Sequence, residues 1–123
     1  MNEDFQKTSR SLRHALRGIV YAFAHERNFR IETVVALGTG VAALILPLSS
    51  AERAAIFLVI AMIFALEILN TAFERAMDIM KPGIHPYVKV VKDLAAGAVL
   101  VVSLLSVVIG AVIFIPHIAA LLF

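Results

Sequence analysis

Long apolar stretches alternate with short polar segments along this chain, and the pattern predicts an all-α integral membrane protein. Three stretches, at residues 29–48, 51–80 and 90–119, reach the roughly 20 residues that a helix needs to cross a bilayer. The whole chain has 123 residues, which is enough for a single domain. The sequence therefore predicts three membrane-spanning helices within one membrane-embedded domain, 1–123.

Serine, proline and glycine residues predict where these helices begin and end. Ser50 is expected to cap the second spanning helix, because serine accepts a hydrogen bond from a free N–H in the first turn. The tripeptide KPG at residues 81–83 is expected to end that helix, and a polar loop is expected to follow up to residue 91. Pro116 is expected to end or kink the third helix.

Residues 1–27 have a different pattern, with apolar and basic side chains on opposite sides of a predicted helix. The apolar positions recur at helical spacing: Phe5, Leu12, Leu16, Ile19 and Phe23. The basic positions lie on the other side: Lys7, Arg10, Arg13 and Arg17. A basic amphipathic helix beside spans typically lies on an anionic lipid surface. The alternative is a packing helix with a solvated charged side.

The composition supports a membrane protein and excludes some chemistry. The chain is 61% hydrophobic and 16% charged, whereas soluble domains average about 45–50% apolar and about 25% charged residues. It has no cysteine, which excludes disulfides and thiolate metal sites. No Walker A or GxGxxG motif is found, so any nucleotide site must be of another kind.

The distribution of positive charge predicts the orientation of the spans. Residues 1–30 hold six Lys or Arg, and the loop after the second span holds Lys81, Lys89 and Lys92. The turn between the first two spans holds only Arg53, and the tail after the third span holds none. Because cytoplasmic loops carry the excess of Lys and Arg, the N-terminus is expected in the cytosol and the C-terminus outside.

The second span carries a polar stripe. Five polar side chains lie within an arc of roughly 100° on one helix face: Glu67, Asn70, Thr71, Glu74 and Asp78. An acid at the middle of a membrane helix costs roughly 2.5–3.5 kcal/mol on insertion scales. Helix-to-helix hydrogen bonds return only about 0.6 kcal/mol each on average. Such bonds could explain Asn70 and Thr71, but the two glutamates indicate function.

The predicted topology brings most ionisable groups of the spans to one end, at the inner membrane interface. Glu26 and Glu32 lie at the start of the first span, and Lys92 and Asp93 open the third. Carboxylates can hold Mg²⁺, cations can neutralise a transferred phosphoryl group, and a buried carboxylate can serve as a general base. The arrangement favours a reaction between a soluble donor and a lipid, and suits a transmembrane ion path poorly.

Three segments resemble the signatures of one known family. Residues 67–74 read EILNTAFE and are followed by Asp78, residues 92–100 read KDLAAGAVL, and residues 26–30 read ERNFR. Together they resemble the small prokaryotic diacylglycerol kinase and undecaprenol kinase family, over nearly the whole chain. The resemblance implies an ATP-dependent homotrimeric lipid kinase of the bacterial cytoplasmic membrane. It also implies a surface helix, three spans and active sites between protomers.

The resemblance also implies roles for individual residues. Glu67 is expected to be the catalytic base, and Glu26 and Glu74 are expected to hold Mg²⁺ on the nucleotide. The nucleotide and phosphate site is expected to include Asn70, Glu74, Asp78, Lys92 and Asp93, together with Lys7 and Arg17 of the first helix.

The lipid substrate stays open between two alcohols. Residues 95–98 and 85–89 resemble the undecaprenol branch of the family, whereas an acid at Glu32 is similar to the diacylglycerol branch. Undecaprenol is favoured, with diacylglycerol a close second. The alternative function is a non-catalytic membrane subunit for transport or assembly, which would explain the polar stripe as an ion path.

Overall fold

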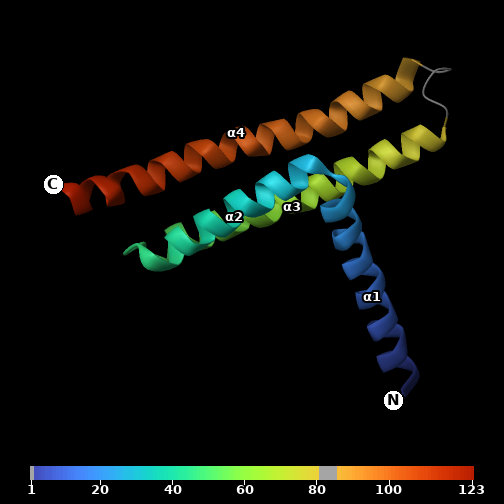
Figure 1. The fold of residues 1–123 in the computed structure, drawn as a ribbon, viewed down its shortest axis with the longest axis horizontal. Coiled ribbons are helices and arrows are strands. Elements are labelled where there is room, and N and C mark those ends of the chain that lie inside the picture. Colours follow the sequence, from blue (N-terminus) through green and yellow to red (C-terminus); the bar gives the residue numbers. More distant parts are fainter. Residues whose placement is uncertain (1, 81–85) are drawn as a thin grey trace.

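The computed structural model describes residues 2–80 and 86–123, and the described chain is entirely helical apart from its turns. Its helices are α1 (Asn2–His25), α2 (Arg27–Ile45), α3 (Ser50–Ile79) and α4 (Pro86–Leu122) (Figure 1). Helices α2, α3 and α4, of 19, 30 and 37 residues, are each long and apolar enough to cross a membrane. The prediction of an all-α protein with three candidate spans is confirmed.

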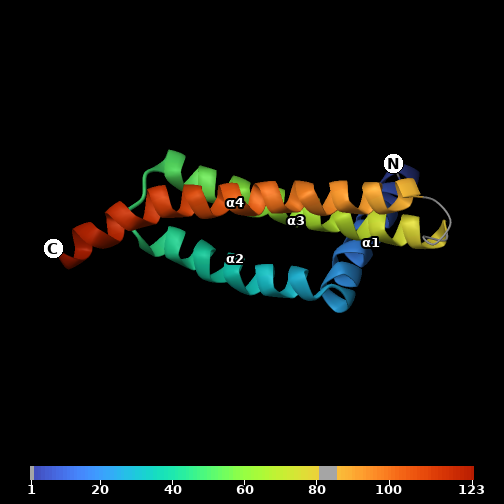
Figure 2. The same cartoon turned by 90° about the horizontal axis from the view of Figure 1, so that it is seen from above.

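Helix α3 is the centre of the bundle. It packs against α2 and against α4, whereas the backbones of α2 and α4 do not approach each other closely within the described residues. The three helices run side by side (Figures 1 and 2). Helix α1 turns sharply away from the bundle and contacts only its near end, through α2 and α3.

The turn between α2 and α3 corrects one prediction. Ser49, not Ser50, caps α3: its hydroxyl accepts a bond from the Glu52 N–H at 3.2 Å, and the Glu52 carboxylate accepts from the Ser49 N–H at 2.8 Å. This reciprocal capping box requires the glutamate three residues after the cap, and only Ser49 meets that spacing. Arg53 donates to the carbonyls of Ala43 and Leu48, at 3.0 and 3.4 Å, and so satisfies acceptors at the end of α2.

The sequence predicts a loop around Pro86 and an end or a kink at Pro116, but both prolines lie within α4. The helix already begins at Pro86, where a ring locked at helical φ fits the first turn. It also continues through Pro116 to Leu122, so the predicted end at Pro116 is wrong, while the predicted kink stays a prediction. Residues 81–85, which include the expected KPG stop and His85, lie outside the described residues, and the described part of α3 ends at Ile79 with Met80 as its cap.

A small core braces the end of the bundle opposite α1. Its buried members are Ala43, Leu48, Ile56 and Ile113. Beside this core, His117 Nε2 lies 3.7 Å from a carboxylate oxygen of Glu52, so the start of α3 is linked to the end of α4. Most large apolar side chains of the three spans are exposed instead, as expected where lipid or other helices replace water.

Candidate functional site

The site begins at Glu26, the one residue between α1 and α2. Its backbone is extended (φ −105°, ψ 118°), and this break in helical geometry allows α1 to leave the bundle. As the N-cap of α2, Glu26 makes no side-chain capping bond. Its carboxylate reaches across to α3 instead, where it pairs with the Arg75 guanidinium at 3.2 Å. The bend between the helices therefore presents an acid to the polar face of α3.

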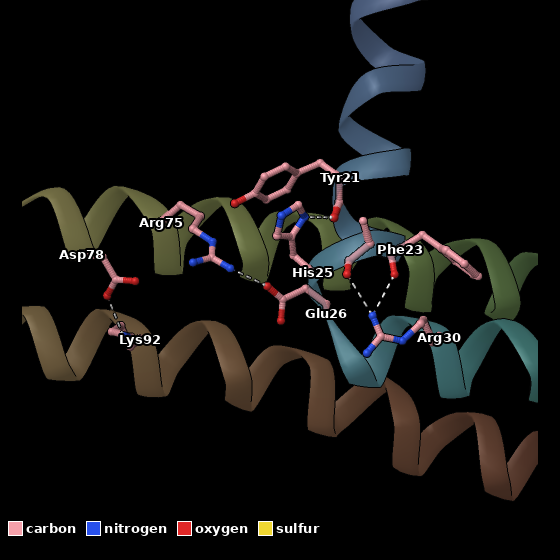
Figure 3. A network of polar contacts seen from close by, with 9 residues as sticks. Tyr21, Phe23, His25, Glu26, Arg30, Arg75, Asp78 and Lys92 are labelled. Carbon is pink, nitrogen blue, oxygen red and sulfur yellow. Dashed lines mark hydrogen bonds and ion pairs between the residues drawn. The ribbon is translucent and has the colours of Figure 1, made fainter.

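Aromatic and guanidinium groups hold the α1–α2 junction in place (Figure 3). The rings of Tyr21 and His25 stack with centroids 4.1 Å apart, and Arg75 lies over the Tyr21 ring at 5.7 Å. Arg30 donates to the carbonyls of Phe23 and Ala24, at 3.1 and 3.0 Å. These carbonyls belong to the last turn of α1, where free acceptors and the helix dipole favour a cation. The position of Glu26 is thus fixed from both helices.

Glu67 and Thr71 are the two buried polar residues of α3, at 4% and 5% exposure. The ring of Phe29 packs on Phe64 with centroids 5.2 Å apart and brings the start of α2 to this level of α3. One helical turn further along α2, the carboxyl group of Glu32 lies within interaction range of Glu67. A carboxylate in such surroundings is costly unless bonds or a function compensate it.

Four carboxyl groups share one region of the bundle: one comes from the α1–α2 junction, one from α2 and two from α3. The carboxyl group of Glu67 interacts with that of Glu32 through a hydrogen bond, and it lies within electrostatic range of Glu26 and Glu74. Two oxygen atoms beside them are buried without a hydrogen bond from a donor group: Asn70 Oδ1, and Glu32 Oε2, whose carboxyl group interacts with that of Glu67. Buried polar atoms without partners are rare in folded proteins, and they point to a ligand or a catalytic role.

A second polar contact joins α3 to α4 at the same end. Lys92 Nζ lies 3.1 Å from Asp78 Oδ1 (Figure 3). At the other end, Glu52 faces His117, so the two helices run antiparallel in one register along their whole contact. This register sets Ser103 of α4 at the level of Glu67. Asp93 follows Lys92 on α4 and is exposed.

The structure brings together some of the residues predicted from the sequence and leaves others apart. Glu26, Glu67 and Glu74 share one cluster, and Asp78 meets Lys92. Lys7 and Arg17 are not brought to these acids, because α1 leads away from the bundle (Figure 1). Lys7 lies 18 residues before His25, which is about 27 Å along a helix. The nucleotide-binding role of both residues stays a prediction.

Sequence reasoning assigned no site role to Glu32 or Arg75, although both lie in the cluster. Glu32 could have been identified from the sequence, because an acid within an apolar span is costly to insert and therefore indicates a function, as it does at Glu67. The signal for Arg75 was weaker. It is a single cation beside the stripe of α3, and its pairing with Glu26 depends on how α1 and α2 meet.

The carboxylates of Glu26 and Glu74 are suited to a metal ion that is already bound to other ligands, such as phosphate oxygens. Among the described residues, no group of three or more His, Asp or Glu side chains is arranged to hold a metal ion by itself. Mg²⁺ in nucleotide sites is usually held by one or two carboxylates together with phosphate oxygens and water. Glu26 and Glu74 supply that donor type, so the residues fit a nucleotide-borne Mg²⁺ better than a resident metal.

Comparison with known proteins decides the family. The family model described as prokaryotic diacylglycerol kinase matches residues 13–114, most of the chain. The chain belongs to this family. It is 41% identical over 107 residues to a protein from Bacillus subtilis named undecaprenol kinase, with 87% of each chain covered. It is 37% identical over 113 residues to a Synechocystis protein named diacylglycerol kinase, covering 91% of this chain and 65% of that relative.

Membership of the prokaryotic diacylglycerol kinase family makes the chain a lipid kinase. The resemblance drawn from the three sequence signatures is thereby confirmed. The alternative of a non-catalytic transport or assembly subunit is not favoured, since the family and both relatives are named as kinases.

Proposed function

We propose that this membrane kinase transfers the γ-phosphate of ATP to a lipid alcohol at the cytosolic interface, with undecaprenol as its preferred acceptor and diacylglycerol as the second candidate. The observation that carries the proposal is the carboxyl cluster around buried Glu67, with Arg75 paired to Glu26 and with the Lys92–Asp78 pair nearer the end of α3. The higher identity to the relative named undecaprenol kinase supports the preferred acceptor.

Glu67 is the proposed general base. It is buried and has further carboxyl groups around it, so it can accept the proton of an attacking lipid hydroxyl away from bulk water. A positioned general base contributes typically 10²–10⁴-fold to a rate. Asn70, whose carbonyl oxygen is buried without a hydrogen-bond partner one turn from Glu67, would form part of the nucleotide site.

The groups closer to the end of α3 are the proposed nucleotide site. Glu26 and Glu74 would hold Mg²⁺, which when bound neutralises charge on the nucleotide phosphates. Lys92 would contact phosphate oxygens after exchanging its pairing with Asp78, and Asp93 lies beside it. The ion pair between Glu26 and Arg75 keeps the carboxylate in position before the nucleotide enters.

The membrane arrangement follows from the same features. The charged end of the bundle is the proposed cytosolic side, with the N-terminus in the cytosol and the C-terminus outside. Helix α1 leaves the bundle at this level, so it would lie along the membrane surface with its apolar side in lipid (Figure 1). A homotrimer is proposed because Asp78, Arg75 and Asp93 stay exposed in one protomer, where a neighbouring protomer would complete the site.

The proposal is tested by measuring phosphate transfer by the purified protein in lipid, with undecaprenol and with diacylglycerol as acceptors. Labelled phosphate should pass from MgATP to undecaprenol with a higher kcat/KM than to diacylglycerol. MgATP should also raise the melting temperature of the wild type and not that of Glu74→Ala. Absence of transfer to both alcohols, together with absence of a thermal shift at millimolar MgATP, would contradict the proposal. Faster transfer to diacylglycerol would contradict only the acceptor preference.

A further inference from the structure

Arg75 belongs to α3, but it is held by groups from two other parts of the chain. Its guanidinium pairs with the carboxylate of Glu26 at the α1–α2 junction, with 3.2 Å between Nη2 and Oε1. It also lies over the ring of Tyr21 on α1, 5.7 Å from the ring centroid. Figure 3 shows Arg75 reaching from α3 toward both groups. A cation therefore lies directly against Glu26, a proposed ligand of Mg²⁺.

The pair of Arg75 with Glu26 uses only part of each group. Among the described residues it joins one nitrogen to one oxygen, so the second carboxylate oxygen and most guanidinium N–H groups make no bond within the protein. The Arg75 side chain is 48% exposed, and that of Glu26 is 22% exposed. Exposed ion pairs contribute little to stability, because water and salt screen them. Both groups can therefore exchange partners at small cost.

Tyr21 supports the guanidinium independently of the carboxylate. A guanidinium is attracted to the face of an aromatic ring, and the Tyr21 ring is itself stacked on His25, with centroids 4.1 Å apart. The planar fork of an arginine binds two phosphate oxygens at once, which a lysine does not do. Arg75 thus has one support that persists when Glu26 is withdrawn, and N–H donors that match a phosphate group.

Other cations at this end of the bundle have different partners or lie apart. Lys92 pairs with Asp78 at 3.1 Å, and Arg30 donates to two carbonyls in the last turn of α1. Lys7 lies on the part of α1 that leads away from the bundle (Figure 1). Four carboxyl groups share this region, and they repel the phosphates of a nucleotide. Sites of phosphoryl transfer offset such charge with cations as well as with metal ions.

We propose that Arg75 binds a phosphate group of the nucleotide and gives up Glu26 when it does so. Without nucleotide, Arg75 neutralises the Glu26 carboxylate. When MgATP is bound, Glu26 holds Mg²⁺, and the Arg75 guanidinium donates to a phosphate oxygen while it stays over the Tyr21 ring. This inference rests on the proposed function, which gave Arg75 no contact with the nucleotide. It follows that Glu26 and phosphate compete for Arg75 unless a metal ion occupies Glu26.

Nucleotide binding with and without Mg²⁺ tests this competition, measured by calorimetry on the full chain in lipid. Glu26→Gln should weaken the binding of MgATP, because a metal ligand is lost. The same variant should tighten the binding of ATP in EDTA about two- to fivefold, which is the most that releasing an exposed ion pair provides. The double variant Glu26→Gln with Arg75→Met should lack this gain. A gain that persists there would come from reduced repulsion alone, and it would overturn the proposal.

A double-variant cycle separates contact with the phosphate from mere positioning of Glu26. Arg75→Met should raise the Kd for MgATP about tenfold or more, because the phosphate contact and the support of Glu26 are both lost. Arg75→Lys, which keeps the charge without the fork, should show an intermediate loss. In the Glu26→Gln background, Arg75→Met should still weaken MgATP binding. No further loss in that background would mean that Arg75 acts only through Glu26, and it would overturn the proposal.

Arg27→Met is the matched control, because Arg27 is an exposed cation next to Glu26 in the chain. It should leave both Kd values nearly unchanged. A loss equal to that of Arg75→Met would mean general attraction of the nucleotide to positive charge, which also overturns the proposal.

These binding measurements need no turnover, so the exchange and the kinase function can fail separately. The expected shifts in a protein that transfers no phosphate would support the exchange and contradict the kinase function. Transfer to undecaprenol or diacylglycerol, with nucleotide binding unchanged in Arg75→Met, would overturn the exchange and leave the kinase function intact. Unchanged MgATP binding in Glu26→Gln would remove the metal role of Glu26, and the exchange with it.

Discussion

Replacing Glu67 by Gln tests the base assignment most directly, because the two side chains have the same shape and differ in charge and basicity. Glu67 is 4% exposed and lies within interaction range of three other carboxyl groups. The substitution therefore removes the proposed proton acceptor and, at the same time, one ionisable group from a crowded apolar site. It should lower activity and raise stability together.

The sizes of both effects can be estimated. Losing a positioned general base should reduce kcat about 10²–10⁴-fold, which corresponds to about 2.7–5.4 kcal/mol of transition-state stabilisation. An acid within a membrane helix costs roughly 2.5–3.5 kcal/mol at its centre. Glu67 lies 12 residues from the end of α3 at Ile79, or about 18 Å along the helix, but on the charged side of the span's centre, so only part of this penalty applies. Because glutamine is also polar, the variant should recover only a fraction of this penalty and be slightly more stable than the wild type.

The assay combines phosphate transfer under saturating MgATP and lipid with thermal unfolding of the same samples. The KM for MgATP should stay constant, because a base that acts in the transition state does not contribute to nucleotide binding. Glu52→Gln is the matched control, since it makes the same change at the far end of α3 and should leave kcat unchanged. Full activity of Glu67→Gln would refute the base assignment. Lost activity with a lowered melting temperature would indicate a structural role instead.

Three further substitutions test other parts of the site and fold. Lys92→Met should raise the KM for MgATP about tenfold to a hundredfold, because a charged hydrogen bond is worth about 1.5–3 kcal/mol, whereas Lys92→Arg should raise it less. Arg75→Met should lower stability by only about 0–1 kcal/mol, since Arg75 is 48% exposed, but should weaken MgATP binding by releasing Glu26. Ser49→Ala should lower the free energy of unfolding by about 1 kcal/mol without changing kcat.

The same measurements can contradict each of these three predictions. An unchanged nucleotide KM in Lys92→Met would remove Lys92 from the phosphate site. A large loss of stability in Arg75→Met would mean that its pair with Glu26 holds the fold rather than the site. Lost turnover in Ser49→Ala would link the far end of the bundle to catalysis.

Features within single helices were predictable from the sequence. The period of 3.6 residues places Glu67, Asn70, Thr71, Glu74 and Asp78 on one face whatever the helix packs against. The lengths of the apolar stretches fixed three candidate spans, and alternating helix direction brought Glu26 and Lys92 to the same end as the stripe. These conclusions depend only on local geometry and on the solvent that apolar residues require.

Contacts between helices were decided by the tertiary structure. The register of α2 on α3 depends on the capping box at Ser49 and on the contact of Phe29 with Phe64, and it set Glu32 beside Glu67. The bend at Glu26 aimed its carboxylate at Arg75 and led the rest of α1 away. The backbones of α2 and α4 both approach α3 but stay apart from each other within the described residues, which no pattern along one helix could show. Periodicity along one helix fixes which face is polar, but the side chains that meet across helices depend on turns, caps and packing that act together.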